Sequence, residues 1–135
     1  VKRGETIAVS LYFAGFTEMR SGVVITGPLS GGYFAVGDQT EEAVLGMDTS
    51  KKTHTVYFLS DIDVLTDEGN RTLICYGDSI TAQAWPDELM LRTLENGDGT
   101  TAVIRKAASG TRILRRYDNI TYDSYGLKGE TRFPR

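Results

Sequence analysis

The middle of the chain carries the pattern that most constrains its fold. Residues 72–76 form a continuous apolar run, which is typical of a parallel strand buried on both faces. Residues 86–94 follow with a helical pattern, and Asp87 in the first turn is favourable beside the positive end of the helix dipole. Residues 102–105 are a second apolar strand candidate. The order strand, helix, strand predicts a βαβ unit with a right-handed crossover.

Residues 1–68 predict a small antiparallel β module, either a sheet or a sandwich. Short stretches rich in β-branched and aromatic residues are separated there by turn residues. We expect strands at residues 6–13, 22–26, 32–36, 53–59 and 62–65. The turn at residues 67–70 is the predicted boundary, so that residues 69–135 begin an α/β domain. Within that domain we expect a helix to start at residues 112–117, and residues 118–135 to be irregular with one short helix.

Composition and charge narrow the classes of partner. The 135 residues suffice for one domain or two small pieces. The net charge is −3 without a basic block, which argues against nucleic acid and anionic membrane surfaces as partners. The sequence holds no apolar stretch of membrane-spanning length and no signal-peptide pattern. The single cysteine, Cys75, excludes an intrachain disulfide and is predicted to be buried in its strand.

A serine follows the first strand of the predicted βαβ unit. The run Gly77-Asp78-Ser79-Ile80-Thr81 comes directly after the apolar residues and before the helix. Open α/β sheets bind ligands at the carboxyl ends of their strands, so Ser79 is a candidate nucleophile. We expect Asp78 to shape the turn through hydrogen bonds to nearby backbone. A serine nucleophile needs a base, and the only histidine, His54, precedes it and is predicted to be an ordinary strand or turn residue.

Two blocks of the sequence resemble a known hydrolase family. The run Gly77-Asp78-Ser79-Ile80-Thr81 resembles the first signature block of the SGNH (GDSL-type) hydrolases, and Ala108-Ser109-Gly110-Thr111-Arg112-Ile113-Leu114 resembles their second block. The resemblance covers residues 70–135, and residues 1–68 are similar to the β module that precedes the catalytic domain in some bacterial members. It implies an α/β fold in which this chain supplies the first βαβ part of a flavodoxin-like three-layer sheet, left incomplete.

The resemblance also implies a mechanism. Ser79 would attack an ester carbonyl and form an acyl-enzyme that water then cleaves. Backbone N–H groups of Ser79 and Gly110, together with an asparagine side chain, would hold the oxyanion. The implied substrate is a small ester or an acetylated carbohydrate, and no cofactor or metal is implied.

Two further blocks of the family are absent from these residues. The sequence contains neither Gly-x-Asn-Asp, the source of the oxyanion asparagine, nor Asp-x-x-His, the source of the base. Asn70, Asn96 and Asn119 do not lie in such a motif. Loss of a triad member typically costs on the order of 10⁴-fold in rate, so we expect the chain alone to be inactive. We expect the sheet to be completed by the C-terminal half of a longer protein or by a second copy of the chain.

A second interpretation belongs to a different class of function. The chain could be a non-catalytic carbohydrate-binding or interaction module that retains the start of a hydrolase. A sugar-contacting surface could draw on aromatic and basic residues near the C-terminus, namely Tyr117, Tyr122, Tyr125, Arg115, Arg116 and Arg132. The presence of Ser79 and Gly110 in matching contexts favours the esterase. Localisation is left open between a bacterial cytoplasm and secretion.

Overall fold

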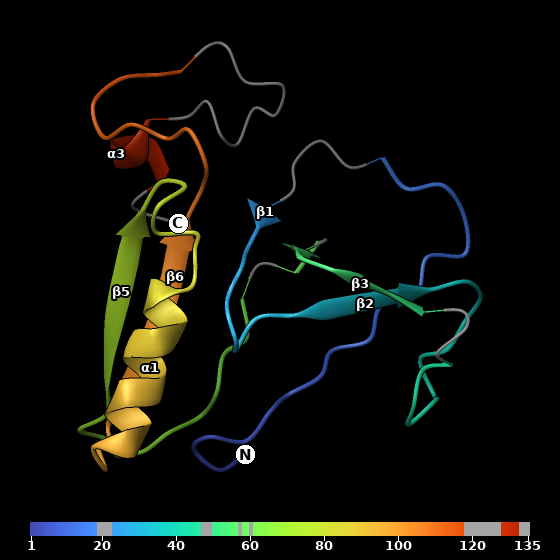
Figure 1. Cartoon of the computed structure of the whole chain (residues 1–135), viewed down its shortest axis with the longest axis horizontal. Coiled ribbons are helices and arrows are strands. Elements are labelled where there is room, and N and C mark those ends of the chain that lie inside the picture. The colour runs from blue at the N-terminus through green and yellow to red at the C-terminus, as the bar shows by residue number, and fades with distance from the viewer. Residues whose placement is uncertain (19–22, 47–49, 57, 60, 118–127, 133–135) are drawn as a thin grey trace.

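The computed structural model describes residues 1–18, 23–46, 50–56, 58–59, 61–117 and 128–132. Its elements, in chain order, are β1 (Val23–Val24), β2 (Gly32–Ala35), β3 (Ser50–Thr53), β4 (Thr55–Val56), β5 (Arg71–Gly77), α1 (Trp85–Glu95), β6 (Thr101–Ala107) and α3 (Gly129–Arg132). Figure 1 shows β5, α1 and β6 on one side and the short strands of the N-terminal half on the other. The fold is therefore mixed α/β.

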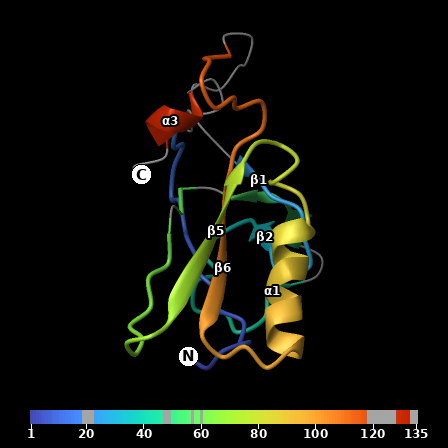
Figure 2. The same ribbon diagram turned by 90° about the vertical axis from the view of Figure 1, so that its left-hand side faces the viewer.

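The predicted βαβ unit is present. Strands β5 and β6 pair in parallel along their whole length, from Arg71 opposite Thr101 to Gly77 opposite Ala107. Helix α1 connects them and lies over one face of the two-stranded sheet (Figure 2). Pro86 stands in the first turn of α1, where a missing N–H costs nothing, and its side chain is fully buried. The apolar strands and the helix between them thus fold as their local patterns predict.

The expectation that β5 is buried on both faces is wrong for its middle. Successive side chains of a strand point to opposite faces, and the neighbours Leu73 and Ile74 are 46% and 56% exposed. Helix α1 packs mainly on β6, which leaves the middle of β5 about half-exposed on both faces. Only Cys75, further along β5, is buried as predicted.

The N-terminal half forms two separate antiparallel pairs instead of one sheet. Strand β1 pairs with β4 and β2 pairs with β3. Residues 6–13 and 62–65 are not strands, because neither stretch pairs its backbone with another segment of the described residues. In the first of them, Phe13 instead packs its ring on Phe58, with ring centroids 4.8 Å apart.

The helix expected at residues 112–117 is also absent, for a reason that lies elsewhere in the chain. The carbonyl groups of Arg112 and Ile113 accept hydrogen bonds from the N–H groups of Gly129 and Glu130, at 2.7 and 3.3 Å. Those N–H groups begin α3, so this tertiary contact holds residues 112–113 out of a helix. Helix α3 is the short helix expected near the C-terminus, while residues 118–127 and 133–135 lie outside the described part.

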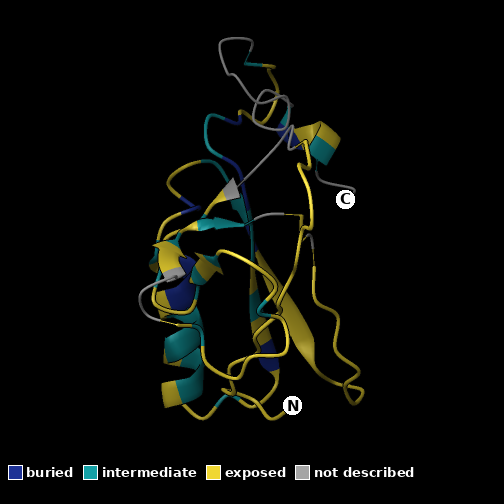
Figure 3. Cartoon of the chain, turned by 90° about the vertical axis from the view of Figure 1, so that its right-hand side faces the viewer, coloured by how far each residue is buried: buried dark blue, intermediate teal, exposed yellow. Residues whose placement is uncertain are grey.

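The chain exposes more surface than its size predicts. Its accessible area is 10424 Å², whereas a folded monomer of 14.8 kDa exposes about 7,000 Å² by the usual scaling. Figure 3 shows exposed residues along β5 and over much of the N-terminal half. None of the described helices has the length and apolar character needed to cross a bilayer.

Candidate functional site

The two sequence blocks singled out above meet at one edge of the β5–β6 sheet. Gly77 and Ala107, the last residues of β5 and β6, stand opposite each other. Ser79 follows the first by two residues and Gly110 follows the second by three. The N–H of Ala108 donates to the carbonyl of Gly77 at 3.1 Å, which ties the two loops together where they leave the sheet. This is the carboxyl edge, where open α/β sheets bind ligands.

The loop that carries Ser79 is a hydrogen-bonded turn. The Oδ1 atom of Asp78 accepts a hydrogen bond from the N–H of Ile80 at 2.9 Å, which confirms the turn-shaping role predicted for Asp78. The carbonyl of Asp78 accepts from the N–H of Ala82 at 3.0 Å. A Cβ at Gly77 would lie 2.2 Å from Oγ1 of Thr81, so the position just before the turn requires glycine. The turn leaves Ser79 exposed.

The second loop contains a backbone conformation that suits glycine. Gly110 has a φ of 75°, in the left-handed region that side chains disfavour. The N–H of Thr111, the next residue, donates to the carbonyl of Ala108 at 3.2 Å and closes the turn around Gly110. The structure thus places Gly110 on the loop neighbouring that of Ser79, and its role in an oxyanion hole stays a prediction.

No described residue contacts the Ser79 hydroxyl as a base would. Its side chain makes no hydrogen bond within the described ranges, which include His54. The histidine lies between β3 and β4, where its carbonyl accepts from the N–H of Ile25 at 2.9 Å, as expected for an ordinary strand or turn residue. Asn70 precedes β5, Asn96 ends α1, and Asn119 falls outside the described residues.

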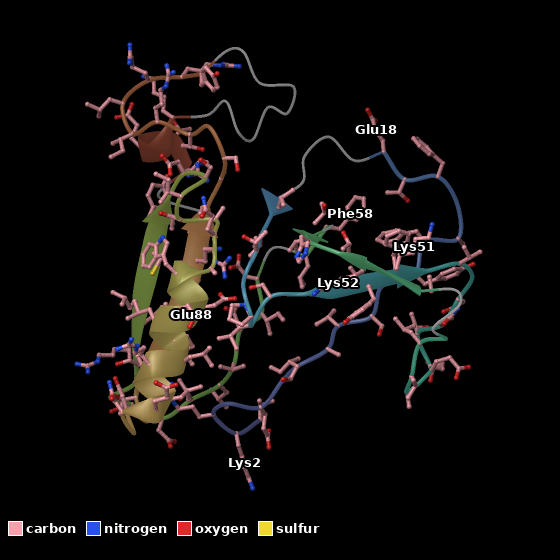
Figure 4. All side chains as sticks on the ribbon, in the orientation of Figure 1. Lys2, Glu18, Lys51, Lys52, Phe58 and Glu88 are labelled. Carbon is pink, nitrogen blue, oxygen red and sulfur yellow. The ribbon has the colours of Figure 1, made fainter. Side chains whose placement is uncertain are left out.

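A buried ion pair next to this edge escaped the sequence analysis. Arg105 of β6 and Asp87 of α1 form a salt bridge, and their side chains are only 6% and 9% exposed. Sequence reasoning assigned Asp87 to the helix dipole alone. The first turn of α1 holds two acidic residues, Asp87 and Glu88. Glu88, labelled in Figure 4, is the exposed one. The sequence did contain a signal of this pair, because Arg105 is a charged residue inside an apolar strand. A charged residue is rarely buried without a partner of opposite charge.

The ion pair also connects the N-terminal half to the Ser79 loop. Asp87 Oδ2 accepts from the N–H of Leu29 at 2.9 Å, and Arg105 Nη1 donates to the carbonyls of Thr26 and Ala82, both at 3.1 Å. The N–H of Thr26 donates to the same Ala82 carbonyl at 3.2 Å. Ala82 closes the turn around Ser79, so β6, α1 and residues 26–29 jointly hold that turn.

A cavity of about 350 Å³ opens beside the two loops. We call it the strand-end cavity; it is lined by Gly77, Asp78, Thr111, Arg112 and Arg132, among others. A second cavity, of about 380 Å³, lies at the opposite edge of the same sheet, around the first residues of β5. We take the strand-end cavity as the candidate site because α/β sheets bind ligands at carboxyl edges. Ser79 and Gly110 lie on the two loops beside it and are not among the residues that line it.

The cysteine near this edge is not a nucleophile in the described fold. Burial raises the pKa of the Cys75 thiol, and the nearby Arg105 charge offsets this only in part. The thiolate is the reactive form, so a raised pKa keeps Cys75 inert. Among the described residues, no group of three or more His, Cys, Asp or Glu side chains could hold a metal ion.

The chain was compared with family models, with curated proteins and with solved structures, and none of the three comparisons finds a match.

Proposed function

We propose that this chain carries the nucleophile half of an SGNH-type serine esterase. The observation that carries the proposal is the pairing of Gly77 with Ala107, which brings the Ser79 and Gly110 loops to one edge of a parallel sheet. Two sequence blocks that resemble the family's first and second signatures therefore lie side by side at the edge where a catalytic site is expected.

In this proposal, Ser79 attacks the carbonyl carbon of an ester, such as an acetyl ester of a carbohydrate. The histidine of the Asp-x-x-His block, supplied from outside these residues, takes the Ser79 hydroxyl proton and passes it to the alcohol as the ester C–O bond breaks and the acyl-enzyme forms. Water then cleaves the acyl-enzyme and releases the acid. The N–H groups of Ser79 and Gly110 stabilise the oxyanion. The left-handed backbone at Gly110 supports this role, because glycine adopts it without strain and has no side chain that would block the approach of the substrate to the N–H group.

The finer fold is part of the same proposal. The βαβ unit corresponds to the start of a flavodoxin-like three-layer sheet, and residues outside this chain supply further strands, the oxyanion asparagine and the Asp–His pair. Two observations support the proposal: β5 is half-exposed on both faces, and the described residues provide no hydrogen bond to the Ser79 hydroxyl. A second copy of the chain is the other candidate cover for β5.

Labelling with a fluorophosphonate ester tests the esterase. The probe phosphonylates only an activated serine, so we expect no labelling of the 135-residue chain and clear labelling of Ser79 when the chain is joined to a segment that supplies Asp-x-x-His. The Ser79→Ala variant of the longer protein is the control and should not label. Enzyme-like hydrolysis of p-nitrophenyl acetate by the 135-residue chain, abolished by Ser79→Ala, would show that the proposed division of the catalytic residues is wrong.

A further inference from the structure

Two arginines line the strand-end cavity without a salt bridge to any described residue. Arg132 enters from α3: its Nη2 donates to the carbonyl of Gly77 at 3.2 Å, and its Cζ lies 5.1 Å from the Tyr76 ring centroid. Arg112 enters from the loop after β6, with its Cζ 4.5 Å from the Tyr117 ring centroid. These contacts orient the two guanidinium groups and leave most of their N–H donors available.

Polar atoms without partners gather at the same place. Within the described ranges, three buried side-chain nitrogen or oxygen atoms lack a hydrogen-bond partner, namely Arg105 Nε, Thr111 Oγ1 and Arg132 Nε. Two of these three belong to residues that line the strand-end cavity. Thr111 is only 8% exposed, and a buried hydroxyl left unpaired destabilises a fold. Its hydroxyl and methyl groups are similar in size, so rotation about χ1 can turn the hydroxyl toward the cavity.

Arg105 has a carboxylate partner that the arginines of the strand-end cavity lack among the described residues. Arg105 is buried against the carboxylate of Asp87 and donates to two backbone carbonyls as well. Arg132 is half-buried and, within the described part of the chain, contacts one carbonyl and no carboxylate. Among the described residues that line the cavity, Asp78 is the one acid, and it already accepts the N–H of Ile80. The two arginines and this aspartate leave a formal charge of +1 on the wall, which matches one monoanion.

We propose that the strand-end cavity binds a carboxylate of the substrate, so that the enzyme acts on esters of acidic sugars. The planar guanidinium groups of Arg132 and Arg112 match the geometry of a carboxylate, and the Thr111 hydroxyl donates a further hydrogen bond. The cavity volume, about 350 Å³, is within the usual range for small-molecule sites. The claim that this carboxylate belongs to the substrate rests on the proposed function. The claim that the cavity binds a carboxylate does not rest on it.

Figure 4 shows nitrogen-bearing side chains gathered around α3 and the neighbouring strand ends. An anion titration tests whether these side chains form a binding site. The ¹⁵N-labelled 135-residue chain is titrated with sodium glucuronate, with glucose as the neutral control and sodium chloride to hold the ionic strength constant. We expect saturable shifts of the Gly77, Thr111 and Gly129 amide signals with glucuronate and none with glucose. Equal shifts with glucose, or none with glucuronate, overturn the proposal.

Charge-matched variants locate the site. Arg112→Gln removes one cation from an exposed position, and we expect the Kd for glucuronate to rise about tenfold, as for loss of a charge-assisted hydrogen bond. Arg132→Gln should have at least the same effect. Arg92→Gln removes an exposed arginine of α1 that lies outside the cavity wall and should leave the Kd within about twofold, the size of a screened long-range effect. Equal weakening by Arg92→Gln overturns the site.

Thr111→Val separates binding from folding. The variant keeps the shape of the side chain and deletes the unpartnered hydroxyl, so the fold should be at least as stable as before. If the hydroxyl contacts the carboxylate, the Kd for glucuronate rises at the same time; an unchanged Kd removes Thr111 from the site. Glucuronate binding without serine labelling in the longer protein refutes the esterase and keeps the carboxylate site. Labelling without glucuronate binding refutes the carboxylate site and keeps the esterase.

Discussion

Replacement of Asp87 by asparagine should destabilise the chain far more than loss of any other ion pair in the described residues. Asp87→Asn keeps the side-chain shape and an oxygen that can accept the N–H of Leu29, but leaves the guanidinium of Arg105 buried and unpaired. Breaking a buried pair by removing one partner costs about 3–5 kcal/mol. A domain of this size is stable by about 5–15 kcal/mol, so the change consumes a large part of its stability.

Urea unfolding followed by the fluorescence of Trp85 measures the effect. Trp85 is the only tryptophan and stands at the start of α1, two residues before Asp87, so its signal reports on the region that the substitution disturbs. We expect the midpoint to fall with little change in the slope, which would indicate a loss of stability rather than a change in the unfolded state.

A neighbouring ion pair supplies the matched control. Lys106, the residue after Arg105, pairs with Asp61, but these side chains are 33% and 54% exposed. Exposed pairs contribute about 0–1 kcal/mol, so Asp61→Asn should be nearly silent. The double variant Asp87→Asn with Arg105→Met should recover part of the loss, because the stranded charge is then gone. A loss from Asp87→Asn no larger than that from Asp61→Asn would refute the reasoning.

Three further predictions concern single positions. Gly110→Ala should lower the free energy of unfolding by about 1–2 kcal/mol because φ is positive there, whereas Gly99→Ala, with open space around its Cβ, should have little effect in the same urea experiment. Cys75 should react with iodoacetamide at least about tenfold more slowly in the folded chain than in urea, because burial raises its thiol pKa; equal rates would contradict its burial. Hydrogen bonds from Thr101 and Thr100 hold the pKa of Asp98 well below its usual range. Their contribution to stability is complete above the unfolded pKa of about 3.9 and is lost as the pH falls toward the folded pKa, so Asp98→Asn should flatten the acid limb of a stability–pH curve below about pH 4.

The parts of the fold that were predictable from sequence are those encoded locally. The apolar run of β5, the proline that starts α1 and the apolar residues of β6 each carry their signal within a few residues, and all three elements form. The turn role of Asp78 was predictable for the same reason, since its hydrogen bond reaches only two residues along the chain.

The failures trace to partners that local patterns do not contain. Residues 6–13 have strand-like composition, but a strand exists only when another segment completes its ladder. Residues 112–117 have the pattern of a helix start. The first N–H groups of α3 nevertheless donate hydrogen bonds to the carbonyls of Arg112 and Ile113 and so prevent a helix there. Next to the candidate site, Asp87 and Arg105 are 18 residues apart in sequence. The place of Arg105 inside an apolar strand indicates a buried partner, but no local pattern identifies Asp87 as that partner.

The buried ion pair changes what the N-terminal half contributes to the candidate site. The Ala82 carbonyl, at the close of the Ser79 turn, accepts from both Arg105 and the backbone of Thr26. A Cβ at Gly27 would lie 2.2 Å from Asp87 Oδ2. Residues 26–29 therefore approach α1 so closely that only glycine fits at position 27. A loop fixed from two sides loses less freedom when it orders around a reacting group. The β segment thus helps to hold the turn that carries Ser79, and its removal should disturb that turn as well as the strands it contains.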